Sequence, residues 1–464
     1  MHKILLAIVL FVPVVSFHFY GVVAQGEQAK SFNLMHKIDE ARELAKKENV
    51  QMITGVVGTR RVRIGRRRYK DVPITGVIGR EVALAIMDAE GKIAIVRAMK
   101  NDSGFHVQTP GYQLYVRREN GLNSDISCVT PAGAKVLALK YPISNENGRF
   151  GVSEPVVQAV YTPYSGEIKT EEVIKHGIKV QSEFIDKAYS HLKERKIYSR
   201  AFEGKLVTDV IPKDICTVLL MNEHIDPGEF KNESNAKALV ERVLTIIGTN
   251  RDKSYCYSIS SAGAHGLVQM IPSTYRRMES LYPSAGLASN FAAGMCDPVN
   301  SIMAQVLLCD SDWHSMRAHG EIPVGRVGPY LAASYNGGVG RVISCLSHDE
   351  ANWMEAPEDN QTPTQTVTRK VAVRVRTRRG GHRTAYISKS YTTPIFRSET
   401  NKYVRQYHWI NNFFAARNQK GFQPMQEDPS DEEKPKPGSQ DKGAGAVKTE
   451  PTPETGPAAP EPLF

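Results

Sequence analysis

The spacing of apolar residues changes near residue 170, and this change constrains the fold more than any other feature of the 464-residue sequence. Before it, short β-branched runs such as Val82–Ile86 are separated by Gly, Asn, Asp and Pro, a pattern typical of strands and turns. After it, apolar residues recur at helical spacing, as in Ile185–Ile197. We therefore expect an α+β protein, with a β-rich domain of unknown role over 25–170 and a mainly α-helical domain over 171–423.

Several segments add to this plan. Residues 231–255 hold an apolar-periodic stretch that predicts an extra helix. Residues 367–393 hold two alternating runs around a Gly-Gly turn, which predicts a basic β-hairpin inserted into the helical domain. An arginine-rich stretch, Arg60–Lys70, predicts another basic hairpin. Residues 424–464 are rich in Pro, Glu, Lys and Gly and predict a disordered tail.

The inserted hairpin has two interpretations. Residues 369–397 contain nine Lys or Arg and no acid. Such charge protects an exposed sheet edge against aggregation. It also suits a surface that holds an anionic polymer. The sequence favours neither.

The first residues predict export. A basic start precedes Ile4–Val15, a nearly unbroken apolar run that is too short to span a bilayer comfortably. Small residues before Gln25 complete the layout of a signal peptide over 1–24. An uncleaved anchor helix is the alternative. We expect a protein of the periplasm or cell envelope, where its six cysteines, five of them between 216 and 345, are able to form disulfides.

The net charge of +10 indicates polyanionic surroundings. For an exported chain these are peptidoglycan, with its stem-peptide carboxylates, or lipid headgroups, so we expect no nucleic-acid partner. Histidine and cysteine spacings lack the pairs typical of metal sites, and we expect neither metal nor cofactor. The sequence does not predict an oligomeric state.

One predicted loop-to-helix corner concentrates small and polar residues. Gly263, Ala264 and Gly266 allow the backbone to approach a ligand or a neighbouring element closely. Ser260 and Gln269 add hydrogen-bonding groups beside them. A tightly packed corner without a ligand explains the same composition, so the pattern alone does not define a site.

Together with Pro272 and Thr274, this corner resembles the signature of the lytic transglycosylase catalytic (SLT) domain, whose fold is similar to goose-type lysozyme. Two later segments match in the right order. Leu331–Val342 resembles the family's Ala-Tyr-Asn-x-Gly stretch. Ser398–Val404 resembles its Glu-Thr-x-x-Tyr-Val stretch, in the form of the membrane-bound lytic transglycosylase D branch. The resemblance covers about half of the chain and leaves out 25–170.

The position of the catalytic acid departs from the family pattern. The family's Glu usually lies about a dozen residues before the Gly-Ala pair, where this chain has Asn250 and no Glu. The predicted helix after Pro212 places Ile215, Leu219 and Glu223 on one face, with Glu223 near its end. Partial burial there raises the pKa of a carboxyl, as a general acid requires.

The stretch around Glu223 also resembles the family helix that carries the acid, with His224 in place of a Ser. We therefore expect Glu223 to be the catalytic acid. A helix-end carboxylate paired with Lys or Arg is the plain alternative. Other candidates for the acid are Glu229, Glu233 and Glu241.

The resemblance implies a specific reaction. Glu223 would protonate the glycosidic oxygen between N-acetylmuramic acid and N-acetylglucosamine, and the muramic C6 hydroxyl would attack C1 to give a 1,6-anhydro end. Tyr335 and Asn336 would lie beside the scissile sugars, and Tyr403 would close the substrate groove. The groove would otherwise be lined by residues of the small-residue corner, namely Ser260, Gly263, Ala264, Gly266 and Gln269.

Three alternatives stay open. A hydrolytic, lysozyme-like muramidase would need a second carboxylate, such as Asp226 or Asp252, to activate water. A catalytically silent peptidoglycan-binding scaffold would explain the missing Glu at Asn250. An accessory of envelope assembly or secretion would use 25–170 to dock partners.

Overall fold

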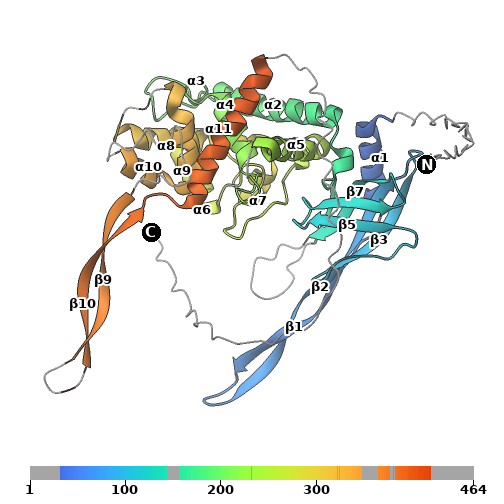
Figure 1. Cartoon of the computed structure of the whole chain (residues 1–464), viewed down its shortest axis with the longest axis horizontal. Coiled ribbons are helices and arrows are strands. Elements are labelled where there is room, and N and C mark those ends of the chain that lie inside the picture. The colour runs from blue at the N-terminus through green and yellow to red at the C-terminus, as the bar shows by residue number, and fades with distance from the viewer. Residues whose placement is uncertain are drawn as a thin grey trace, which may run out of the picture. The chain divides into compact units, whose positions relative to one another are not determined.

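The computed structural model describes residues 32–143, 156–230, 233–320, 322, 324–346, 364–376, 380 and 382–419. The expected signal peptide over 1–24 and the expected tail over 424–464 lie outside these residues. Of the described residues, those up to Ala416 form one compact unit. The α+β class is confirmed, with a β-rich region first, helices after it and a hairpin between the last helices (Figure 1).

The β-rich region is built on one antiparallel sheet in the order β4-β3-β2-β7-β8, with β1 added along β2. A separate pair, β5 and β6, lies beside it. Helix α1 (Leu34–Lys46) precedes the strands. The strands are β1 (Met52–Arg63), β2 (Tyr69–Met87), β3 (Ile93–Asn101), β4 (Gly104–Val107), β5 (Gln113–Arg118), β6 (Asp125–Thr130), β7 (Lys135–Ile143) and β8 (Val157–Tyr161).

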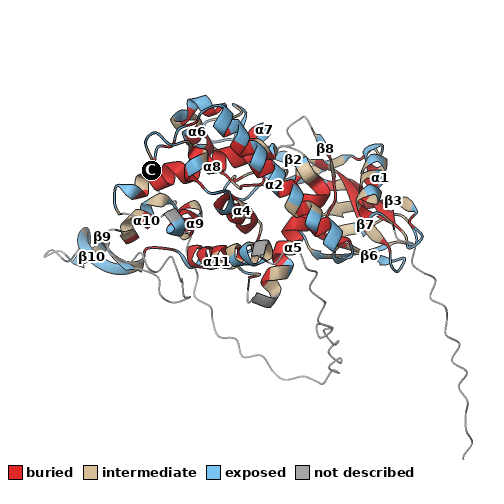
Figure 2. Cartoon of the chain, turned by 90° about the horizontal axis from the view of Figure 1, so that it is seen from above, coloured by how far each residue is buried: buried red, intermediate tan, exposed pale blue. Residues whose placement is uncertain are grey.

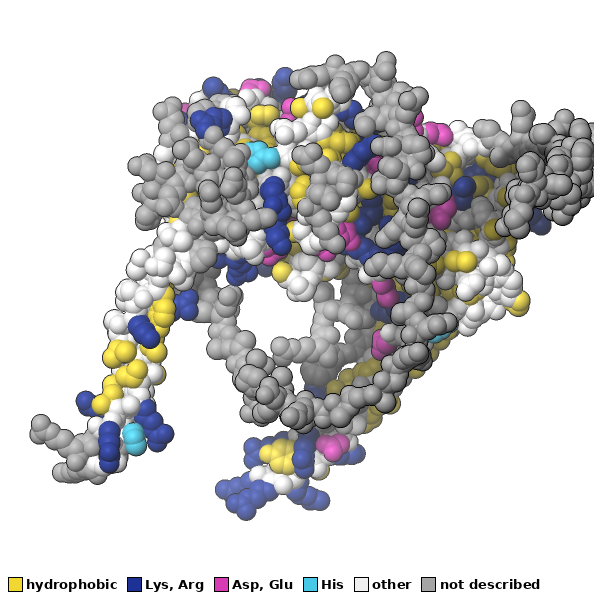
Figure 3. All heavy atoms as spheres, viewed as in Figure 1, with side chains coloured by type: hydrophobic (Ala, Val, Ile, Leu, Met, Phe, Trp, Pro, Cys, Tyr) yellow, Lys and Arg dark blue, Asp and Glu magenta, His cyan; other side chains and the backbone are white. Residues whose placement is uncertain are grey.

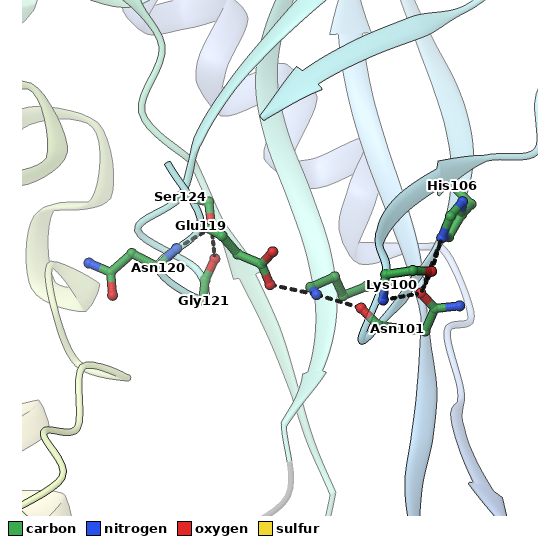
Figure 4. A network of polar contacts seen from close by, with 8 residues as sticks. Lys100, Asn101, His106, Glu119, Asn120, Gly121 and Ser124 are labelled. Atoms are coloured by element: carbon green, nitrogen blue, oxygen red, sulfur yellow. Dashed lines mark hydrogen bonds and ion pairs between the residues drawn. The ribbon is translucent and has the colours of Figure 1, made fainter. Parts of the chain in front are cut away.

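The two faces of this sheet bury different partners, as the period-2 alternation of a strand dictates. Ala85 and Met87 of β2 pack with α1. Leu84 and Ile86, on the other face, join the large core that continues into the helices. The β5–β6 pair is tied to the sheet by an ion pair between Lys100 of β3 and Glu119, part of the polar network in Figure 4.

The helical region surrounds α8 (Pro298–Arg317), in which nearly every residue is buried (Figure 2). A helix that is covered on all sides marks the centre of a helical core. The other helices are α2 (Glu171–Glu194), α3 (Val207–Val210), α4 (Lys213–Asn222), α5 (Glu233–Asn250), α6 (Pro272–Leu281), α7 (Phe291–Cys296), α9 (Val327–Gly337), α10 (Val339–Leu346) and α11 (Ser398–Gln419). Short 3-10 turns are η1 (Gly166–Ile168), η2 (Arg251–Lys253), η3 (Pro283–Ala285) and η4 (Val324–Arg326).

The helix expected within 231–255 is α5, and it crosses α2 at very short range. A Cβ atom on Gly177 of α2 would overlap the carbonyl oxygen of Leu244. A Cβ on Gly248 of α5 would lie 2.6 Å from the carbonyl oxygen of Val173. Small residues on both helices therefore let the backbones touch, and α5 is a core helix instead of a peripheral addition.

Two long hairpins are present where basic ones were expected. Strands β1 and β2 pair out to Arg63 and Tyr69, around the arginine-rich turn. The inserted hairpin consists of β9 (Thr364–Arg376) and β10 (His382–Pro394), paired along their whole length. No helix in the described ranges is long and apolar enough to cross a membrane.

One disulfide forms among the cysteines, between Cys256 and Cys296. The other four thiols are free and buried. This agrees with the expectation that some pairing occurs within 216–345.

The α2–α5 crossing yields a stability prediction. We expect Gly177→Ala to lower the free energy of unfolding by about 1–3 kcal/mol, because the added methyl group would overlap backbone atoms of α5 and force that helix to move. Denaturant unfolding would measure this. Gly166→Ala is the matched control, since a Cβ there has no neighbour within 4 Å. Equal stability of the two variants would contradict the close crossing.

Candidate active site

Glu223 lies at the C-terminal end of α4. The helix buries Ile215 and Leu219, and the Glu223 amide donates to the Leu219 carbonyl at 3.1 Å. The Glu223 side chain is partly buried, which leaves an approach from solvent. Burial raises the pKa of this carboxyl to about 8, and the charge of Glu399 adds to the rise. At neutral pH the carboxyl therefore holds its proton.

Tyr403 of α11 is the direct hydrogen-bond partner of this carboxyl. Its buried hydroxyl donates to Oε1 of Glu223 at 2.6 Å. The bond favours the ionised carboxylate and so opposes part of the rise in pKa. Beside it, Nδ2 of Asn222 donates to the Tyr403 carbonyl at 2.9 Å, which fixes α11 to the end of α4. A carboxyl held in this way can give up a proton and remain stabilised afterwards.

The small-residue corner is a compact turn held on both sides. Gly263 and Gly266 have φ of +79° and +72°, a region that favours glycine. A Cβ on Gly266 would overlap the carbonyl oxygen of Met295, so the turn presses against α7. The Cys256–Cys296 disulfide joins the same two segments.

Polar residues of the corner bond within it. The Ser260 hydroxyl accepts from the Ala264 amide at 3.0 Å, and the Ser260 side chain stays exposed. Nε2 of Gln269 donates to the Gly266 carbonyl at 2.8 Å. Gln269 itself has φ of +44°, which is uncommon for a residue with a side chain. Gln269 was expected to line the substrate groove. Its side chain also holds the turn together, a structural role that the sequence did not indicate.

His224 connects the acid's helix to this corner. Its ring stacks on Tyr255 with centroids 3.5 Å apart, and Nε2 lies 2.8 Å from the Leu267 carbonyl. A carbonyl only accepts, so Nε2 carries the proton. Burial lowers the His224 pKa to about 3, and the ring is neutral near pH 7. His224 thus positions the corner beside Glu223, a role that sequence did not indicate.

Helix α9 reaches the same point from another direction. The Tyr335 hydroxyl donates to the Val268 carbonyl at 2.6 Å. The pKa of Tyr335 is raised chiefly by burial and next by the charge of Glu223, which places the two groups in one electrostatic environment. Asn336 is exposed, and its Oδ1 accepts from the Thr400 hydroxyl of α11 at 2.7 Å. Three segments distant in sequence therefore converge on Glu223.

The other acids considered have structural partners or lie outside the description. Glu229 forms ion pairs with Arg242 at 2.6 Å and Arg118 at 3.3 Å. Glu241 pairs with Lys169 at 3.2 Å. The Glu233 side chain is not among those described. Glu223 itself forms no ion pair with Lys or Arg in the described part of the chain. The plain interpretation of a paired helix-end carboxylate therefore does not apply to it.

Asn250, which stands where the family pattern has its Glu, joins the β-rich region to the helices. Its fully buried side chain accepts from the Thr162 amide at 2.8 Å and donates to the Thr162 carbonyl at 2.9 Å. It also donates to the Ile246 carbonyl at 3.1 Å. A Glu has no donor for these carbonyls when ionised. Asn250 therefore has a structural role at this junction.

A second carboxylate near Glu223 was not singled out from the sequence. Glu399, exposed in the first turn of α11, adds its charge to the environment of Glu223. The sequence feature that could have identified Glu399 is its position in the Ser398–Val404 segment. By contrast, Asp226 accepts from the Gly228 amide at 2.7 Å. Asp252 lines a different hollow, of about 360 Å³, together with Arg42 of α1.

Comparison with family models, with curated proteins and with solved structures finds no match for this chain. Within the described residues no three His, Cys, Asp or Glu side chains gather where they could hold a metal ion.

The raised pKa of Glu223 predicts a pH-dependent stability difference. Between pH 4.5, its ordinary value, and about 8, the folded chain holds a proton that the unfolded chain has released. The stability contributed by Glu223 is therefore full below pH 4.5 and falls as pH rises through about 8. Glu223→Gln cannot ionise, so we expect its Tm to rise relative to the native chain across this interval.

Thermal unfolding at a series of pH values would measure this difference. Glu203→Gln, in an exposed loop, is the matched control for removing one carboxylate. A Tm difference for Glu223→Gln that stays constant with pH would show that the folded chain does not retain this proton.

The bonds of Asn250 predict a second stability change. We expect Asn250→Ala to lower the free energy of unfolding by roughly 2 kcal/mol or more, because the buried Thr162 amide and carbonyl lose their partner. Denaturant unfolding would measure this, with Asp252→Ala as control, since the Asp252 side chain is 71% exposed. Similar free energies of unfolding for the two variants would show that the Asn250 bonds do not stabilise the junction.

Proposed function

We propose that this protein is a peptidoglycan lytic transglycosylase, which cleaves the β-1,4 bond from N-acetylmuramic acid to N-acetylglucosamine and leaves 1,6-anhydro ends. The observation that carries the proposal is the environment of Glu223. Its carboxyl is partly buried, has a pKa raised to about 8 and accepts a bond from Tyr403. It lies where the segments that resemble the SLT domain meet.

The proposed reaction uses this one carboxyl twice. Glu223 first donates its proton to the glycosidic oxygen, and the bond from that oxygen to C1 breaks. The muramic C6 hydroxyl then forms a bond to C1 and returns its proton to the Glu223 carboxylate. No water is consumed. Holding that hydroxyl close to C1 lowers the barrier by several kcal/mol, on the order of 7–11 in favourable intramolecular cases.

The surroundings suit these two steps. The Tyr403 hydroxyl stabilises the carboxylate in the interval between giving and regaining the proton. Tyr335 and Gln269 hold the corner in place through carbonyl bonds. Ser260, the backbone at Gly263 and Asn336 are more open and are proposed to meet hydroxyl or N-acetyl groups of the glycan.

An exported location is part of the proposal. The Cys256–Cys296 disulfide suits an oxidising compartment, such as the periplasm or cell envelope. Peptidoglycan glycan strands are the proposed substrate there. Partners of envelope assembly or secretion would bind through the β-rich region.

One observation favours a second candidate, a hydrolytic muramidase. Glu399 supplies the second carboxylate that activation of water requires, in place of Asp226 or Asp252. The product distinguishes the two reactions, because hydrolysis leaves a reducing end and the transglycosylase leaves an anhydro ring.

The decisive experiment digests purified sacculi with the full chain and identifies the released muropeptides by mass spectrometry. We expect anhydro products from the native protein, with a rate that falls as pH rises through about 8, where Glu223 loses its proton. Glu223→Gln should lower the rate about 100- to 10,000-fold. Tyr403→Phe should slow cleavage while retaining the anhydro product.

Controls separate the alternatives. Glu203→Gln should cleave like the native chain. Anhydro products from Glu223→Gln at full rate would move the acid elsewhere, and reducing-end products that require Glu399 would assign a hydrolase. Sacculus binding without cleavage by the native chain would assign a silent scaffold.

A further inference from the structure

The β9–β10 hairpin has two chemically different faces. Directly paired residues lie on one face of an antiparallel ladder, and successive residues alternate between faces. The register pairs Val371 with Ile387 and Val373 with Ala385. This face, called the apolar face below, carries the apolar side chains Val367, Val371, Val373, Val375, Ala385, Ile387 and Tyr391, and three cations among them, Arg369, Arg383 and Lys389.

This apolar face is open to solvent. Ile387 is 46% exposed, Tyr391 39% and Val375 38%. None of the face's residues belongs to the hydrophobic cores of the described chain. Burial of such aliphatic surface is favourable by about 25 cal/mol per Å². A partner that offers an apolar layer would therefore gain from contact with it.

Both faces of the hairpin carry cations. Lys370, Arg374 and Arg376 alternate with the valines and so point away from them. On the apolar face itself, Arg369 pairs with Lys389 between the Val367–Tyr391 and Val371–Ile387 pairs, and Arg383 pairs with Val375 near the tip. Residues 364–394 contain no Asp or Glu to balance these charges.

The β1–β2 hairpin carries the same combination. Its turn holds three successive arginines, Arg66–Arg68, beside Ile64, which is 58% exposed. Figure 3 shows Lys and Arg gathered near the outer ends of both hairpins, with hydrophobic side chains among them.

We propose that the β9–β10 hairpin binds the surface of an anionic phospholipid bilayer. Its valines, Ile387 and Tyr391 enter the boundary between headgroups and acyl chains, and its Lys and Arg contact lipid phosphates. A soluble polyanion neutralises the cations and leaves the apolar face in water, whereas a bilayer interface accommodates both. The inference goes beyond the proposed function and does not depend on it.

The test is flotation of the full chain with vesicles of phosphatidylcholine, with or without phosphatidylglycerol. If the first residues were retained as an apolar anchor, they would bind both kinds of vesicle, so the ratio of the two affinities isolates the charge-dependent contact. We expect the native chain to prefer anionic vesicles at least tenfold, and to lose that preference as salt rises.

Two hairpin variants then separate the contribution of the charges from that of the apolar side chains. Lys370→Thr with Arg374→Thr and Arg376→Thr removes charge. Val371→Thr with Val373→Thr and Ile387→Thr replaces three apolar side chains at the centre of that face and keeps β-branched residues in the strands. We expect each to weaken anionic-vesicle binding at least tenfold. Lys179→Gln with Lys187→Gln and Lys193→Gln, exposed on α2, is the control of equal charge and should bind like the native chain.

Three results would overturn the proposal. The first is a native chain without preference for anionic vesicles. The second is a charge variant that binds like the α2 control. The third is an apolar variant with native affinity, which would make the hairpin a contact for soluble polyanions such as nucleic acid or wall polymers. Thermal unfolding of each variant shows whether the rest of the fold is intact.

Discussion

The hydrogen bond from the Tyr403 hydroxyl to the Glu223 carboxyl joins two segments 180 residues apart, and the chemistry proposed for the molecule depends on it. Burial alone would make the ionised carboxylate too costly to form, and a cationic partner would make the proton too easy to lose. A tyrosine hydroxyl lies between these limits, since it donates one bond without bringing a charge. The carboxyl is therefore protonated near pH 7 and stabilised once ionised.

Keeping these groups together requires the whole helical region. The corner after residue 258 is held by His224, which directly follows the end of α4, by Tyr335 from α9 and by the disulfide to α7. Each of these contacts ends on a backbone carbonyl or a covalent bond, so the corner is fixed by its main chain. Ser260 and Asn336 stay exposed, although the side-chain oxygen of each accepts a bond from within the protein.

The β-rich region is part of the same packed body through the ends of α5 and β8. Asn250 bonds both backbone groups of Thr162, and α5 lies directly on α2 through glycine contacts. The helix that separates the acid from the small-residue corner is thus the element on which the β-rich region docks.

Periodicity in the sequence determined the α+β class, the inserted hairpin and the position of Glu223 on the apolar face of a helix, because these are local patterns. The sequence could not decide what Asn250 does, since its partner Thr162 is distant in the chain and found only by folding. The sequence also could not decide that burial keeps His224 neutral. Nor could it show that the charge of Glu399 raises the pKa of Glu223. Tertiary structure alone sets those quantities, because desolvation and charge proximity are properties of space and not of sequence order.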